Sequence, residues 1–105
     1  MHAASRMRQY QQQDVTTSSP ERLVVKLYDL GIAACYRGDR AKTRAVLVEL
    51  MSALDHEQGG DLAARLYGLY VFCLDESARG DLAVVADLLG GLREAWQDGV
   101  LSRAA

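Results

Sequence analysis

The side chains with the greatest potential for chemistry are two histidines, two cysteines and a short run of basic residues. His56 lies between Asp55 and Glu57, and such a trio could contribute to a metal site. A metal site needs three or four converging ligands, however, and the sequence offers no further His or Cys at a ligand spacing. The trio is therefore interpreted as a solvated loop, and no bound metal is expected.

Cys35 and Cys73 fall on apolar lines of predicted helices and not at the spacing of a disulfide framework. Small buried hydrophobic thiols are favoured over disulfide or redox chemistry, which is the alternative. The basic run could bind a phosphate, but it lacks interleaved aromatic residues, and a solvated helix face is favoured. The run consists of Arg37, Arg40, Lys42 and Arg44.

No pattern in the chain is typical of an enzyme. The sequence contains no glycine-rich phosphate loop after a strand, no strand pattern, and no helical pair of carboxylates directed into a core. Ser18 and Ser19 have a sufficient role as helix caps. We therefore expect an interaction protein with no catalytic residue and no cofactor.

Length and charge narrow the class of protein further. The 105 residues predict a single domain, and a net charge of −2 argues against a general nucleic-acid binder. No apolar run approaches the roughly 18 residues of a membrane span, so no membrane insertion is expected. Residues 1–17 lack the apolar segment of a signal peptide, which predicts a cytoplasmic protein.

The stretch around which the chain is organised begins at Ser18. Ser18 with Glu21 fits a capping box, and Ser19 with Pro20 fits an N-cap followed by proline at the first helical position. The helix that follows carries apolar residues over more than half of its circumference, wider than the stripe of about 100° that one neighbouring helix covers. The predicted seam consists of Leu23, Leu27, Leu30 and Ala34.

The same signals divide the chain into four helices, at about 20–36, 40–54, 62–78 and from residue 82 to about residue 98. Asp39, Asp61 and Asp81 are the predicted caps of the last three, and a bend or close helix contact is expected at Gly90 and Gly91. The fold class is therefore all-α, an antiparallel up-and-down four-helix bundle over residues 18–98. Residues 1–17 are expected to be mobile or loosely docked.

The first and third helices lie diagonally in such a bundle, and both carry more apolar surface than the core needs. The seam of the third helix is placed at Leu62, Leu66, Leu69 and Cys73. Apolar residues beside the two seams should contact a partner, because exposed apolar patches of this kind usually mark an interaction. The candidate groove residues are Val25, Tyr28, Ile32, Tyr36, Tyr67, Tyr70, Val71 and Leu74.

Several motifs together carry a resemblance to a known family. In chain order they are Tyr10, Ser18-Ser19-Pro20-Glu21-Arg22-Leu23-Val24, Leu27-Tyr28-Asp29, Leu54-Asp55-His56-Glu57-Gln58-Gly59-Gly60-Asp61-Leu62-Ala63, Leu66-Tyr67, Leu69-Tyr70 and Leu92-Arg93-Glu94-Ala95-Trp96. This ordered combination resembles the flagellin-specific export chaperones of bacterial flagella, the FliS family.

The resemblance implies a chaperone that binds the disordered C-terminal segment of flagellin, prevents its premature polymerisation and delivers it to the flagellar type III export apparatus. It also implies an N-terminal segment that covers part of the groove, with a tyrosine linked to the export gate protein. Tyr10 matches that tyrosine, and Val15 is the second candidate contact of this lid. The free protein is expected to be a monomer or weak dimer. The alternative is a structural homodimer that does not bind flagellin.

Overall fold

The computed structural model describes residues 20–101, which form four α-helices and a short π-helical end. The elements in chain order are α2 (Pro20–Tyr36), α3 (Arg40–Ser52), α4 (His56–Arg79), α5 (Leu82–Ala95) and η1 (Trp96–Leu101). Pro20 is the first residue of α2, as predicted, while the caps predicted at Ser18 and Ser19 lie outside the described residues. No helix within 20–101 combines the length and the apolarity needed to cross a membrane.

The turn between α2 and α3 agrees closely with the sequence prediction. Gly38 adopts the left-handed conformation (φ 71°), its N–H donates to the Cys35 carbonyl, and the Asp39 N–H donates to the Ala34 carbonyl. These two bonds make a Schellman motif, which satisfies the last carbonyls of α2. The Asp39 carboxylate then accepts from the Lys42 N–H at 3.0 Å and caps α3. One short turn therefore reverses the chain.

The start of the third helix differs from the prediction. The cap is Asp55, whose Oδ1 accepts from the Glu57 and Gln58 N–H groups, and the first helical turn occupies residues expected to form a loop. At Gly60 the backbone leaves helical geometry (φ 51°, ψ −121°), and the helix resumes at Asp61. Asp61 therefore follows a kink and is not the cap. Glycine permits this kink because it has no Cβ to clash at positive φ.

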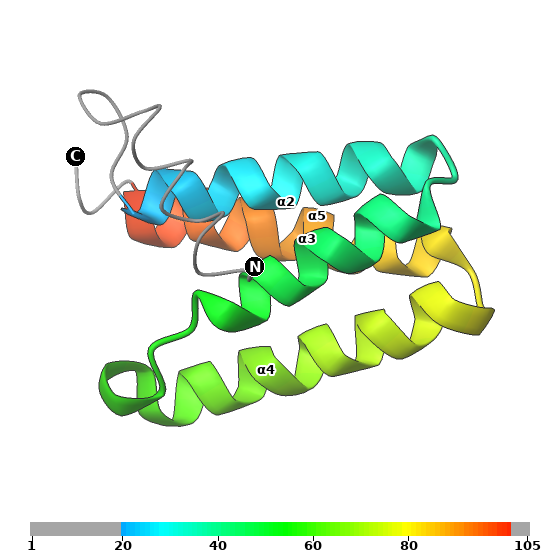
Figure 1. Ribbon diagram of the computed structural model, residues 1–105. Coiled ribbons are helices and arrows are strands. Elements are labelled where there is room, and N and C mark those ends of the chain that lie inside the picture. Colours follow the sequence, from blue (N-terminus) through cyan, green and yellow to red (C-terminus); the bar gives the residue numbers. More distant parts are fainter. Residues whose placement is uncertain (1–19, 102–105) are drawn as a thin grey trace.

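The four helices form an antiparallel up-and-down bundle, which confirms the predicted fold class. Figure 1 shows α2 and α4 on opposite sides of the bundle, with α3 in front and α5 behind. Each of α2 and α4 packs against both α3 and α5, so α2 and α4 are the diagonal pair.

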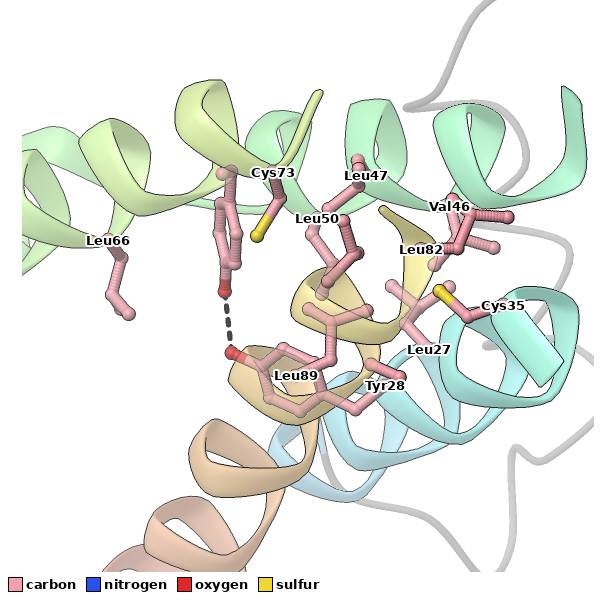
Figure 2. Close-up of a cluster of buried hydrophobic side chains, with 13 residues drawn as sticks. Leu27, Tyr28, Cys35, Val46, Leu47, Leu50, Leu66, Cys73, Leu82 and Leu89 are labelled. Atoms are coloured by element: carbon pink, nitrogen blue, oxygen red, sulfur yellow. Dashed lines mark hydrogen bonds between the residues drawn. The ribbon is translucent and has the colours of Figure 1, made fainter. Parts of the chain in front are cut away.

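The core lies where the four helices face one another. Figure 2 shows side chains of the cluster converging from all four of them. Its best-buried members include Leu27, Tyr28, Leu47, Leu50, Tyr70, Cys73, Val85 and Leu89, each no more than 1% exposed.

The spacing of apolar residues predicts one buried face on α3, with Thr43, Val46, Leu47, Leu50, Met51 and Leu54, and one on α5, with Val85, Leu88, Leu89, Leu92 and Trp96. Thr43, Val46, Leu47 and Leu50 of α3 and Val85 and Leu89 of α5 are buried as predicted. The prediction that Glu49 of α3 lies away from the buried face is wrong, because Glu49 is only 2% exposed.

The buried face of α4 is rotated from the one predicted. Its buried residues are Ala63, Leu66, Tyr70, Cys73 and Ser77. Leu62 and Leu69, assigned to the seam, are 63% and 37% exposed, and Leu30 of α2 is also exposed at 36%. Apolar residues surround so much of each helix that their spacing alone does not fix which direction faces the core.

Among the described glycines, Gly31 packs tightly against neighbouring helices, and the glycine pair of α5 does not. A Cβ at Gly31 would lie 2.9 Å from Leu89 Cδ1 and 3.2 Å from Val46 Cγ1. Gly90 and Gly91 have no neighbour within 4 Å of such a Cβ, and no kink interrupts α5. The prediction of a bend or close contact at the glycine pair is therefore wrong.

Candidate binding site

A buried pair of tyrosines joins the two diagonal helices. Tyr28 Oη and Tyr70 Oη lie 2.6 Å apart in a hydrogen bond, drawn as the dashed line in Figure 2. Either hydroxyl can donate. Burial raises the pKa of both phenols, and the neighbouring Tyr28 raises that of Tyr70 further. Both side chains are therefore neutral, bonded members of the core.

Three of the predicted groove residues are not at the surface. Tyr28 and Tyr70 are 0% and 1% exposed, and Val25 is 8% exposed. In this structure they belong to the core and not to an exposed groove. For the two tyrosines the reason is that their hydroxyls satisfy each other, which lets both rings enter the core. Ile32 and Leu74 are partly buried and pack against the same core.

The other three predicted groove residues are exposed, but they do not form one surface. Tyr67 and Val71 are 43% and 42% exposed and lie one turn apart on α4, so they share a line along that helix. The Tyr67 ring also meets the His56 ring edge to face, with centroids 5.8 Å apart. Tyr36, 79% exposed, ends α2, the helix diagonally across the bundle.

Exposed apolar side chains concentrate on α4. Five large ones lie on this helix, and they flank both sides of its buried stripe: Leu62, Tyr67, Leu69, Val71 and Phe72. Leu62 and Leu69, seven residues apart, follow one edge, while Tyr67 and Val71 follow the other. Of these five, the predicted groove included only Tyr67 and Val71. The sequence did indicate that the other three could be exposed, because apolar residues surround the whole helix.

A half-open cavity of about 250 Å³ lies under the first half of α4. Its α4 wall includes Leu62, Ala63, Leu66 and Tyr70, and Trp96 of η1 also lines it. The opposite wall consists of Glu21 and Val24 of α2 together with Leu50, Ala53, Leu54 and Asp55. In Figure 2, Leu66 lies apart from the other labelled side chains. The lining is mostly apolar, so the cavity suits apolar groups.

The two cysteines are buried in the core, where burial makes them unreactive. Cys35 and Cys73 are both buried free thiols, and burial raises the pKa of Cys73 to about 11 and also raises that of Cys35. A raised pKa leaves little reactive thiolate at neutral pH. No group of three His, Cys, Asp or Glu side chains that could hold a metal ion occurs in the described part of the chain.

Two arginines of the basic run bind the end of α4. Arg40 donates from Nη1 to the Ser77 carbonyl at 2.8 Å and from Nη2 to the Gly80 carbonyl at 3.1 Å. Arg44 Nη1 donates to the Leu74 carbonyl at 2.8 Å and to Ser77 Oγ at 3.1 Å. We call Arg40 and Arg44 the arginine clamp. Their role in the fold replaces the solvated face predicted for them.

Comparison of the sequence with known proteins identifies a family. The family model described as flagellar protein FliS matches residues 39–103, more than half of the chain. The flagellar secretion chaperone FliS of Campylobacter jejuni subsp. jejuni is 28% identical over 110 residues, covering 85% of this chain and 86% of that protein. No solved structure matches the chain.

Proposed function

This chain belongs to the FliS family of flagellar proteins, and from this premise we propose that it is a flagellar export chaperone acting in the cytoplasm. It binds the disordered C-terminal segment of flagellin, prevents premature polymerisation, and delivers flagellin to the export gate. The Campylobacter relative is itself a flagellar secretion chaperone, which supports the general role. No catalytic step is part of the proposal.

The concentration of apolar side chains on α4 is the observation that carries the proposed binding. A disordered segment that becomes an amphipathic helix on binding needs an apolar surface along which to lie. The exposed line of Tyr67 and Val71 is one such surface, and the cavity beneath Leu62 and Leu66 is adjacent to the same helix. Phe72 adds a further exposed ring, at 46%.

Calorimetric titration with a peptide of the flagellin C-terminal segment tests this function. Val71→Asp should weaken binding at least about tenfold while leaving the thermal midpoint nearly unchanged, because position 71 is exposed. Ala41→Asp, which adds the same charge to an exposed position in the first turn of α3, is the matched control. Equal affinity of Val71→Asp and the unmodified chain for the peptide would exclude the Tyr67–Val71 line as the binding surface. Absence of binding by the unmodified chain would exclude the proposed function.

Oligomeric mass separates the chaperone from the homodimer. A free monomer or weak dimer that becomes a 1:1 complex with flagellin in light scattering supports the chaperone. An obligate dimer without affinity for flagellin would replace it. Ile32→Asp does not serve in this test, because Ile32 packs against the core and its replacement would change stability as well as binding.

The N-terminal residues are proposed to act as a lid and as the contact with the export gate. Tyr10 and Val15 lie outside the described residues, but α2 begins at Pro20, next to Glu21 at the wall of the cavity. Position 20, the first described residue, is therefore adjacent in sequence to a wall of the cavity. A lid that occupies apolar surface competes with flagellin for it and lowers the apparent affinity.

Two variants test the lid and the gate contact separately. Deletion of residues 1–15 should leave flagellin affinity unchanged or higher, by up to about 1–2 kcal/mol for one docked tyrosine and valine. Tyr10→Ala should preserve the 1:1 complex and reduce flagellin secretion in a motile host. Weaker binding after the deletion would exclude the lid, and normal secretion by Tyr10→Ala would exclude the gate contact.

A further inference from the structure

The two halves of α4 are attached to the bundle in different ways. At its C-terminal end, the arginine clamp makes four hydrogen bonds to residues 74, 77 and 80. Three of the four acceptors are backbone carbonyls. The Ser77 carbonyl lies in the last turn of α4, where carbonyls lack helical partners, and the Gly80 carbonyl follows directly, at the end where the helix dipole favours a positive charge. Charge-assisted bonds of this kind are stronger than neutral ones. The last turns of α4 are therefore fixed to α3.

The first half of α4 has weaker support. Its buried residues are Ala63, Leu66 and Tyr70, whereas Leu62 is 63% exposed. A cavity of about 250 Å³ lies beside these residues and is also lined by residues of α2 and α3. Empty volume means that the lining side chains lack the dispersion contacts of a packed core. The non-helical backbone at Gly60 also separates this half from the turn capped by Asp55. The helix is thus free to change direction at its start.

Between the two halves stands the Tyr28–Tyr70 hydrogen bond. Tyr70 also lines the cavity, so its hydroxyl lies near the space into which water would enter if α4 moved away. Water can then bond to both hydroxyls and replace the bond that is lost. The pair therefore stabilises the closed state, and water limits the free energy lost when its bond breaks on opening.

From these three features we infer that the first half of α4, residues 61–70, opens away from α2 while the arginine clamp keeps residues 74–80 in place. Opening turns the cavity into a groove continuous with the exposed apolar residues of α4. This inference rests on the proposed function in one respect, since the groove would receive the apolar side of the flagellin segment. The motion itself is a property of the free protein.

Native cysteines allow the motion to be measured within one chain. Ala63→Cys places a thiol at a position 4% exposed in the first half of α4, beside the cavity. Cys73, 0% exposed, reports on the second half of α4, and Cys35, 7% exposed, reports on α2. All three need an opening reaction before a thiol reagent reaches them. Labelling followed by peptide mass spectrometry gives three rates from one sample.

We expect position 63 to be labelled at least about tenfold faster than Cys35 and Cys73, with a weaker dependence on denaturant, as for local opening. Tyr70→Phe should increase the rate at position 63 relative to Cys35. Equal rates at all three positions, with the same dependence on denaturant, would show that α4 opens only in global unfolding and would overturn the inference. Amide hydrogen exchange of the unmodified chain, comparing residues 61–70 with residues 74–80, gives the same comparison without the added cysteine.

A clamp variant tests the fixed end. Arg44→Met removes the bonds to Leu74 and Ser77 and should bring the labelling rate of Cys73 closer to that of position 63. An equal rise in the labelling rate at all three positions would show that Arg44 supports only the global stability of the bundle. These rates are measured without flagellin, so their failure is distinct from a failure to bind. If both proposals hold, the flagellin peptide will also change the rate at position 63 more than the rate at Cys35.

Discussion

The Tyr28–Tyr70 hydrogen bond makes a quantitative prediction about stability. Tyr28→Phe and Tyr70→Phe each remove one hydroxyl and leave the other without the partner it has at 2.6 Å. The double variant removes both hydroxyls and leaves two rings of nearly unchanged shape. The three variants with the unmodified chain form a double-mutant cycle, which isolates the interaction between the two hydroxyls.

The size of the effect follows from burial and from the cavity. Leaving a buried hydroxyl unsatisfied costs about 1–3 kcal/mol, whereas replacing both partners by apolar groups is nearly neutral. Tyr70 lines the cavity, so water can reach an orphaned hydroxyl there, and we expect each single variant to lose only about 1–2 kcal/mol. The double variant should then be more stable than the sum of the single losses implies.

Urea unfolding followed by tryptophan fluorescence measures all four free energies. The chain has one tryptophan, Trp96, which packs against the core and lines the same cavity, so its emission reports on this region. Far-ultraviolet circular dichroism on the same samples checks that unfolding is two-state. Additive losses, with the double variant equal to the sum of the single ones, would refute the argument that the two hydroxyls satisfy each other.

Three further predictions concern packing, the α4 face and pH. Gly31→Ala should lower the free energy of unfolding by about 1–3 kcal/mol, because its Cβ would meet Leu89 at 2.9 Å. Gly91→Ala should be neutral or stabilising by up to about 1 kcal/mol, because no neighbour lies near its Cβ. Urea titration of both variants measures the two free energies of unfolding. Leu89→Ala should cost about 2–5 kcal/mol and Leu69→Ala much less, by thermal melting, since the first residue is 0% and the second 37% exposed. Stability should also fall as pH rises from about 9 towards 11, because burial raises the pKa of the Cys73 thiol from its ordinary 9.0 to about 11, and the thiol therefore ionises first in the unfolded chain. Cys73→Ala should make urea midpoints fall less steeply over that range without removing the fall, because burial also raises the pKa of Cys35, Tyr28 and Tyr70.

The buried face of a helix could be predicted where apolar residues lie on one side, and could not be predicted where apolar residues surround the helix. Most polar residues of α3 and α5 lie on one side, so the predicted faces containing Leu47 and Leu89 are confirmed, but the burial of Glu49 on α3 does not follow from that pattern. In α4 the spacing allowed several directions, and the actual stripe includes the small residues Ala63 and Ser77, which hydrophobicity alone does not rank highly. Burial of Tyr70 depends on a hydroxyl partner on another helix, which no local pattern shows.

Helix caps depend on neighbouring residues in the sequence and could be predicted, whereas the cavity depends on residues far apart in the sequence and could not. Asp39 and Asp81 were correctly identified, since each directly precedes a helix and its carboxylate accepts from that helix. Asp55 was missed, although Gln58 three residues later fits a capping pattern. The cavity has no sequence signature, because it depends on how α2, α3, α4 and η1 meet.

The pairing of the first helix with the last has a consequence for biosynthesis. The helix α2 packs most extensively against α5, through contacts that include Asp29 with Arg93 and the close approach of Gly31 to Leu89. The ribosome makes α2 before α5, so the part of the apolar side of α2 that α5 covers stays uncovered until α5 has been made, although α3 can cover the other part earlier. Contacts between such distant segments also slow folding compared with successive hairpins. Nascent chains that terminate before Leu82 should therefore aggregate or be degraded rather than accumulate as partial bundles.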